Sequence, residues 1–132
     1  MINVTVTYTD NLGPEADIPE LLRRIAARLE ADFGRESMVG VCIGALRLTD
    51  FIVGDGRPDW ASVAIRARLP ADRVEALRRP LLEDLTALVE THLADFYRGR
   101  SLTISVELAP TAAENVVERL NVGPPRGSGF QG

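Results

Sequence analysis

A pattern of strand, helix and strand occurs twice along the chain, and this repeat restricts the folds that the sequence can adopt. Laying residues 2–33 over residues 61–93 matches a strand with a strand and a helix with a helix. Two βαβ units side by side form a four-stranded mixed sheet with both helices on one face. The sequence therefore predicts an α+β fold built as a tandem βαβ repeat.

The face of this sheet that carries no helix needs another cover. A large uncovered surface usually marks a contact with another protein, and most soluble oligomers are closed assemblies of identical chains. We therefore expect copies of this chain to cover the face in a homo-oligomer.

The first unit opens with a strand over residues 2–9. Apolar or aromatic side chains occupy one phase of this stretch and polar ones the other, which is typical of a strand with one buried face. The two sets are Ile2, Val4, Val6 and Tyr8 against Asn3, Thr5, Thr7 and Thr9. Asp10 and Asn11, followed by Gly13 and Pro14, predict the turn that ends the strand.

A helix and a second strand complete this unit. Apolar side chains recur at three and four residues from Ile18 to Phe33, with Asp17 as the expected cap and Gly34 at the far end. The apolar run from Met38 to Val53 predicts a long or bent second strand, because it contains two glycines.

The second unit repeats the plan. A strand is expected from Trp60 to Leu69, then a helix capped at Asp72 that runs through Arg98, then a strand from Ser101 to Leu108. Pro80 lies inside the helical pattern, so we expect a kink or a short break there.

These boundaries make residues 1–110 a single domain, with repeats of about 1–58 and 59–110. Residues 111–132 form an extension that is rich in glycine and proline near its end. Such a segment has too few apolar side chains to pack alone, so partial disorder and an arm across a neighbouring subunit both stay open.

Composition excludes several classes of function. The 132 residues are 45% hydrophobic and 26% charged with a net charge of -4, as in a soluble globular domain. The basic residues are scattered along the chain, which argues against a nucleic-acid surface. All of them are arginine, which fits a bacterial coding sequence rich in GC. No stretch approaches the roughly 20 apolar residues of a membrane span.

Cys42 is the one cysteine of the chain and lies in an apolar run. We expect a buried core thiol, because no histidine lies near it in the sequence to activate it as a nucleophile. A single cysteine and the lack of a signal-like N-terminus predict a cytoplasmic protein.

Short motifs within this repeat resemble a known family. They are the opening Val4-Thr5-Val6-Thr7-Tyr8-Thr9-Asp10-Asn11, the Gly54-Asp55-Gly56 turn before an aromatic-led strand, and Arg73 just after that strand. Over residues 2–110 the chain resembles 5-carboxymethyl-2-hydroxymuconate Δ-isomerase, a family of the tautomerase superfamily. The resemblance implies a homotrimer and an amino-terminal proline that shuttles a proton between carbons of a small unsaturated oxo or hydroxy acid. It also implies arginines that hold the substrate carboxylates.

The sequence departs from this family at the proline, whose position is taken by Ile2. A bulky second residue generally leaves the initiator in place, so we expect a mature chain that starts at Met1. Its α-amino group, with an ordinary pKa of about 7.7 to 8.0, is then a primary amine displaced by roughly 3.8 Å along the chain. General-base chemistry stays available to it, provided that it comes within about 3 Å of the proton.

The candidate site residues follow from this comparison. We assign catalysis to Met1, Ile2 and Tyr8, and substrate binding to Asn3, Arg47, Arg73 and Trp60. Several have ordinary structural alternatives, in which Arg73 pairs with Asp72 or Glu75, Tyr8 ends its strand against the core, and Trp60 packs at a strand start or a subunit contact. Asp10 and Asn11 are expected to cap a turn. His92 is the one histidine of the chain and is expected on a helix face. A lone histidine without a cluster of other ligands argues against a metal site, and we expect no cofactor.

Two functions follow. The first is a divergent tautomerase-family isomerase that acts on a small carboxylate-bearing substrate, enolisable or unsaturated, with arginine anion binding and an altered base. The second is a tautomerase-fold module that binds a ligand or supports assembly without catalysis, since a fold alone does not decide function.

Overall fold

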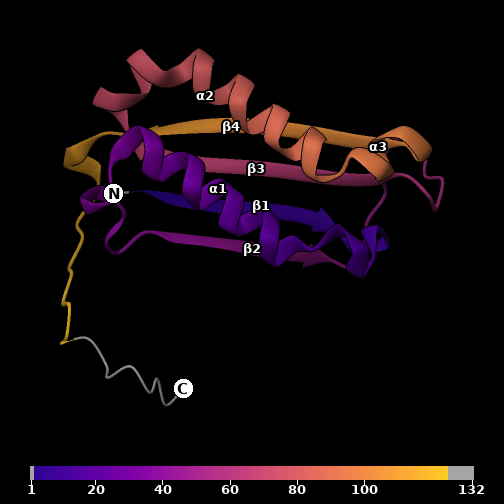
Figure 1. The fold of residues 1–132 in the computed structure, drawn as a ribbon, viewed down its shortest axis with the longest axis horizontal. Coiled ribbons are helices and arrows are strands. Elements are labelled where there is room, and N and C mark those ends of the chain that lie inside the picture. The colour runs from indigo at the N-terminus through magenta and orange to yellow at the C-terminus, as the bar shows by residue number, and fades with distance from the viewer. Residues whose placement is uncertain (1, 125–132) are drawn as a thin grey trace.

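The computed structural model describes residues 2–124 and shows one four-stranded sheet with its helices on one side (Figure 1). In chain order the elements are β1 (Asn3–Thr9), α1 (Ile18–Phe33), β2 (Cys42–Leu48), β3 (Ala61–Pro70), α2 (Ala71–His92), α3 (Ala94–Gly99) and β4 (Leu102–Thr111). The strand order is β2-β1-β3-β4; β1 is parallel to β2 and antiparallel to β3, and β3 is parallel to β4. The predicted α+β fold with two βαβ units is confirmed.

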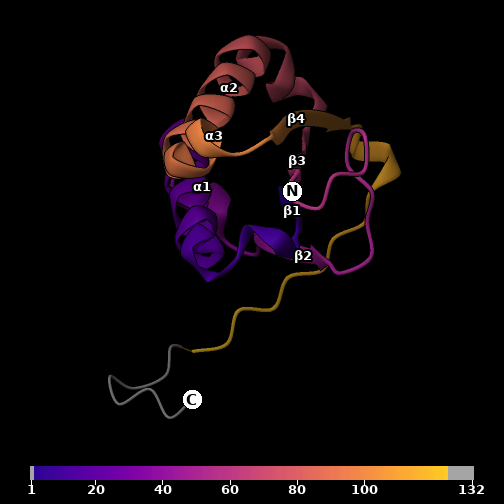
Figure 2. The same cartoon turned by 90° about the vertical axis from the view of Figure 1, so that its right-hand side faces the viewer.

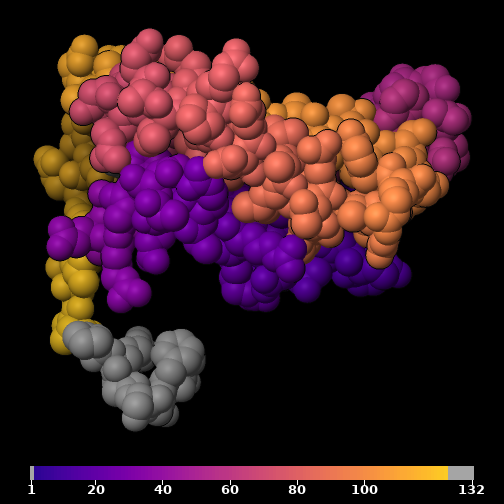
Figure 3. Space-filling model, turned by 45° about the horizontal axis from the view of Figure 1, so that its top comes forward, coloured from indigo at the N-terminus to yellow at the C-terminus, as the bar shows by residue number. Residues whose placement is uncertain are grey.

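The helices cover one face of the sheet only (Figure 2). Val4 and Val6 of β1 point toward the helices and are buried, as the sequence alternation predicts. The odd-numbered residues of β3, from Ala61 to Leu69, do the same. On the helices, Leu21, Ile25 and Leu85 are fully buried against these strands. Figure 3 shows α1 and α2 side by side over this face.

The opposite face, which we call the open face, carries the other phase of each strand. Residues paired in register point to the same side of a sheet, so the pairings extend the assignment from β1 to its neighbours. The open face comprises Asn3, Thr5 and Thr7; Cys42, Gly44, Leu46 and Leu48; Ser62, Ala64, Arg66 and Arg68; and Thr103, Ser105, Glu107 and Ala109. None of α1, α2 and α3 covers it.

The expectation for the second strand is wrong in its length. β2 spans Cys42–Leu48 instead of the whole run from Met38 to Val53. Gly40 has a φ of 82° and Gly54 a φ of 59°, which differ from the extended backbone of a regular strand. The apolar residues after Leu48 lie in a connection, where Ile52 is 86% exposed.

Two expectations for the second helix are wrong, namely a short break at Pro80 and a cap at Asp72. α2 runs as one helix through Pro80, which is exposed, so the alternative of a kink there stays a prediction; the helical path is interrupted at Leu93, between α2 and α3. Proline has no N–H to donate to the carbonyl group one turn earlier in the helix. On the solvent side of a helix, water can bind this carbonyl group instead. Asp72 does not cap α2, because the helix begins at Ala71 directly after Pro70 and no side chain bonds its first turn. Asp17 does cap α1, accepting a hydrogen bond from the backbone N–H of Glu20.

Cys42 is exposed, so the expectation of a core thiol is also wrong. In β2 it is Ile43 and Ala45 that pack against the core, which places Cys42 on the open face. An apolar run hid this alternation, because Gly44, Leu46 and Leu48 on the open face and Ile43 and Ala45 on the core face are all nonpolar.

The chain after β4 leaves the sheet. A short 3-10 turn spans Ala113–Asn115, and residues 116–124 then run outward without regular structure. Val117, Leu120 and Val122 are exposed there. Residues 125–132 lie outside the described residues, so the alternatives for the extension stay predictions.

Candidate active site

The start of β1 is held on both sides by neighbouring strands. Asn3 pairs with Cys42 of β2 and with Arg68 of β3, and all three side chains point to the open face. Ile2 points the other way and is only 4% exposed, packed into the core beneath the helices. The Ile2 side chain therefore anchors the start of β1 in the core. Met1 itself lies outside the described residues.

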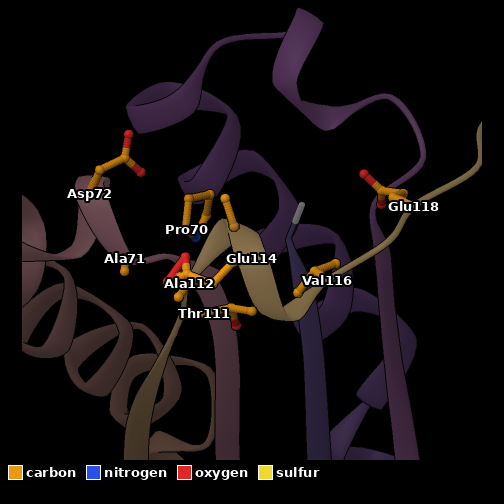
Figure 4. Close-up of a pocket in the computed structure, with 9 residues that line it drawn as sticks. Pro70, Ala71, Asp72, Thr111, Ala112, Glu114, Val116 and Glu118 are labelled. Atoms are coloured by element: carbon orange, nitrogen blue, oxygen red, sulfur yellow. The ribbon is translucent and has the colours of Figure 1, made fainter.

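A pocket of about 580 Å³ lies at this same end of the sheet (Figure 4). It is formed where β3 and β4 end, since Pro70 pairs with Thr111 two positions beyond the pairing of Arg68 with Ala109. The residues that line it are Pro70, Ala71, Asp72, Thr111, Ala112, Ala113, Glu114, Val116 and Glu118. Three of them are acidic and none is basic, so a ligand carboxylate finds no cation within this lining.

Tyr8 and Arg47 lie together at the opposite end of the sheet. They are partners in the β1–β2 register and line a second pocket of about 490 Å³ with Asp10 and Asp17. Tyr8 is six residues beyond Ile2, which at about 3.3 Å per residue places it roughly 20 Å away. Within one chain the structure thus does not bring Tyr8 and Ile2 into one site.

Arg73 is directed toward the end of α1. Its Nη2 donates a hydrogen bond to the carbonyl oxygen of Asp32 at 3.3 Å, and its guanidinium lies 4.8 Å from the centre of the Phe33 ring. A cation at the carboxyl end of a helix binds its free carbonyl groups and stabilises its dipole. Neither Asp72 nor Glu75 forms an ion pair with it in residues 2–124. Arg73 therefore has a structural partner that the sequence did not indicate.

A model of the 5-carboxymethyl-2-hydroxymuconate isomerase family matches residues 3–123. The chain belongs to this family. The 5-carboxymethyl-2-hydroxymuconate Delta-isomerase of Escherichia coli is 30% identical over 108 residues, which cover 82% of this chain and 85% of that protein. A crystal structure of a 5-carboxymethyl-2-hydroxymuconate isomerase from Deinococcus radiodurans R1 is also 30% identical, covering 91% of this chain and 90% of that one with a TM-score of 0.81.

The fold extends to more distant proteins of the tautomerase superfamily. A solved structure described as a fused 4-OT wild type asymmetric trimer is 16% identical, covers 92% of both chains and has a TM-score of 0.62. The predicted family and the tautomerase-like fold are thereby confirmed.

In this member of the isomerase family Trp60 is part of a turn at the Tyr8 end of the sheet. Its Nε1 donates a hydrogen bond to Thr103 Oγ1 at 3.1 Å, and the Arg57 guanidinium lies 5.1 Å from its ring centre. The backbone N–H of Arg57 donates to Asp55 in the same turn, and this bond holds the pKa of that carboxyl below its ordinary value. Trp60 thus packs a loop, far from Ile2.

Asn11 and His92 fasten loops near this end. The Asn11 Nδ2 donates to the carbonyl oxygens of Pro58 and Trp60, both at 3.0 Å, which ties the turn after β1 to the start of β3. The His92 Nε2 lies 2.7 Å from the carbonyl oxygen of Ala16.

Across residues 2–124 no group of three or more His, Cys, Asp or Glu is arranged to hold a metal ion. The same part of the chain contains no helix of the length and apolarity that a bilayer crossing requires.

Arg68 is a candidate residue that the sequence analysis did not select. Its register partner is Asn3, so it lies beside the start of β1, and it is exposed on the open face. It forms no ion pair within residues 2–124, whereas Arg66 on the same strand pairs with Glu107 at 3.6 Å. The alternation of β3 indicates that the Arg68 side chain is exposed, because Arg66 and Arg68 occupy the polar phase of that strand. The alternation does not show that Arg68 pairs with Asn3, which follows only from the register of the sheet.

Proposed function

We propose that this chain is an isomerase that transfers a proton between carbons of a small carboxylate-bearing substrate, enolisable or unsaturated. Membership of the isomerase family supports the reaction type. The observation that carries the proposal is the position of the start of β1, which is fixed between two strands and beside a pocket of about 580 Å³. Proton transfer of this kind uses a positioned base and needs no cofactor.

The base in this proposal is altered from the family's proline. The Ile2 side chain has no titratable group and is buried, so it serves to position the residue before it. The α-amino group of Met1 is the proposed base in a mature chain that begins there, because burial and neighbouring charges can adjust its pKa to the reaction. Intact mass spectrometry tests this, since removal of Met1 would leave the amine on Ile2.

Asn3 is proposed to bind the substrate. Its side chain lies on the open face at the start of β1, and an amide can both donate and accept hydrogen bonds. It does not titrate near neutral pH, so it can orient a carbonyl or enol oxygen but cannot act as the base.

We further propose a homotrimer. The open face exposes Leu46 and Leu48 on β2, and an uncovered apolar surface of this kind is a usual reason for assembly of identical chains. A distant fold relative described as a trimer gives the same expectation. In such an assembly Tyr8 and Arg47 contribute to catalysis only from a neighbouring copy, since they lie roughly 20 Å from Ile2 in their own chain.

The single exposed thiol suits a reducing compartment, so the proposed location is the cytoplasm.

The experiment is a keto-enol assay with phenylenolpyruvate, comparing the wild type with Asn3→Ala. Loss of one hydrogen bond to the reacting oxygen should lower kcat/KM about five- to thirtyfold. Thr7→Ala is the matched control, because Thr7 lies on the same strand and face at the far end. A wild-type rate equal to that of buffer, with bound ligand and intact assembly, would instead indicate a module without catalysis.

A further inference from the structure

We propose that Arg68 binds the carboxylate of the substrate beside Asn3. This inference rests on the isomerase function proposed above and deepens it by naming the cation and the face from which the substrate is held. Arg73, the arginine that the family resemblance indicated, donates a hydrogen bond to the carbonyl oxygen of Asp32 and lies against Phe33 at the end of α1.

Register places Arg68 next to the start of β1. Asn3 and Arg68 are paired across antiparallel strands, and partners in such a pair have Cα atoms about 4.5 to 5.5 Å apart with side chains on one face. A guanidinium at the end of a long side chain can therefore reach a ligand that also contacts the Asn3 amide. Arginine binds a carboxylate through two parallel N–H donors, which fixes orientation as well as position.

The charges of the open face leave Arg68 without compensation. Among the strand residues of this face the charged ones are Arg66, Arg68 and Glu107, and Glu107 pairs with Arg66. A second copy of the chain would cover the face with the same set of charges. Burying a guanidinium without an anion is costly, so covering the face favours a bound anion near Arg68.

The pocket at this end does not supply a competing cation. Asp72, Glu114 and Glu118 all contribute carboxylates to its lining, and a substrate carboxylate would be repelled by them. The favourable orientation places the carboxylate on the open face at Arg68 and the uncharged remainder of the substrate toward the pocket. The substrate class that fits is a monocarboxylate with a neutral, enolisable remainder.

One rival role for Arg68 is structural. In an assembly its guanidinium could pair with acidic side chains of a neighbouring copy, and its loss would then weaken the assembly without changing ligand affinity. The test therefore follows oligomeric state and ligand binding separately, in the full chain.

The variants are Arg68→Gln and Arg68→Lys, with Arg66→Gln as the matched control two residues away on the same strand and face. Steady-state kinetics with phenylenolpyruvate give KM and kcat, calorimetry with phenylpyruvate gives Kd, and light scattering gives the assembly. Arg68→Gln should raise KM and Kd about ten- to hundredfold with kcat changed less, and Arg68→Lys should recover part of the loss. Arg66→Gln should change KM less than threefold, and all three variants should keep the wild-type assembly.

The results separate this inference from the proposed function. A wild type without turnover refutes the isomerase function, while a Kd that weakens tenfold or more in Arg68→Gln still supports Arg68 as the anion site. The inference is overturned by a Kd for Arg68→Gln that matches Arg66→Gln, by a wild type that binds no monocarboxylate, or by dissociation of both Arg68 variants with Arg66→Gln intact.

Discussion

The indole of Trp60 occupies the space that a side chain on Gly54 would need. A Cβ atom built on Gly54 would lie 2.3 Å from Cζ3 of that ring, closer than nonbonded carbon atoms approach each other. Gly54 also has a φ of 59°, a left-handed conformation that favours glycine. The turn before β3 and the aromatic ring that follows it are thus fitted to one another.

Gly54→Ala should therefore destabilise the protein. The clash and the left-handed backbone each cost on the order of 1 to 3 kcal/mol, so the free energy of unfolding in urea should fall by about 2 kcal/mol or more. Gly99→Ala is the control, because its added Cβ meets no atom of residues 2–124 within 4 Å and its backbone is not left-handed. Equal losses from both substitutions would show that the indole does not constrain this turn.

Arg28 links the two long helices. It forms an ion pair with Asp32 of α1 at 2.9 Å and another with Asp84 of α2, and these bonds raise its pKa. Arg28→Ala removes both pairs and leaves the partly buried Asp32 without its cation, so unfolding free energy should fall by about 1 to 2 kcal/mol. Arg79→Ala, which removes only an exposed pair with Glu83, should stay within about 0.5 kcal/mol of the wild type.

Glu20 gives a prediction for pH. The side-chain hydrogen bond from Arg23 is the main reason that the pKa of Glu20 lies below its ordinary value of 4.5. A lowered folded-state pKa stabilises the protein above the unfolded pKa, and this contribution is lost as the pH falls through the folded pKa. In a titration followed by NMR, Glu20 should have its midpoint below 4.5, and Arg23→Ala should move it upward. A midpoint unmoved by Arg23→Ala but moved by Arg79→Ala would contradict this assignment.

The acidic pocket gives a prediction about ligand charge. Glu114 lines it beside the end of β4, so a dicarboxylate should bind more weakly than a monocarboxylate of similar size. Glu114→Gln removes one repulsive charge, which should tighten dicarboxylate binding by about two- to fivefold in calorimetry and leave the monocarboxylate nearly unchanged. Glu75→Gln, an exposed position of α2 outside this pocket, is the control. Tighter dicarboxylate binding in the wild type would argue against this orientation of the substrate.

The fold was largely predictable because its information is local. Alternation in β1 and β3 and the three- and four-residue spacing of α1 each define one buried face, and two such units have few ways to pack. The errors arose where local composition was ambiguous. Nonpolar residues in both phases of β2 hid the alternation around Cys42, and Pro80 is tolerated within α2 because it is exposed to solvent.

The candidate site was less predictable because it depends on register. Sequence order places Tyr8 close to Ile2, yet a strand keeps them roughly 20 Å apart. Arg68 stands far from Asn3 along the chain and becomes its neighbour only through antiparallel pairing. Arg73 was assigned to substrate binding through the family resemblance, whereas its partners, the Asp32 carbonyl and the Phe33 ring, come from α1.

The most direct measurement is the rate at which the purified full chain converts phenylenolpyruvate to its keto form, compared with the methyl ester of the same enol. We expect saturable acceleration of the acid over buffer and a far weaker effect on the ester, because only the acid carries the carboxylate that Arg68 is proposed to bind. Equal rates for acid and ester, or no acceleration of either, would contradict a carboxylate-binding isomerase site at the start of β1.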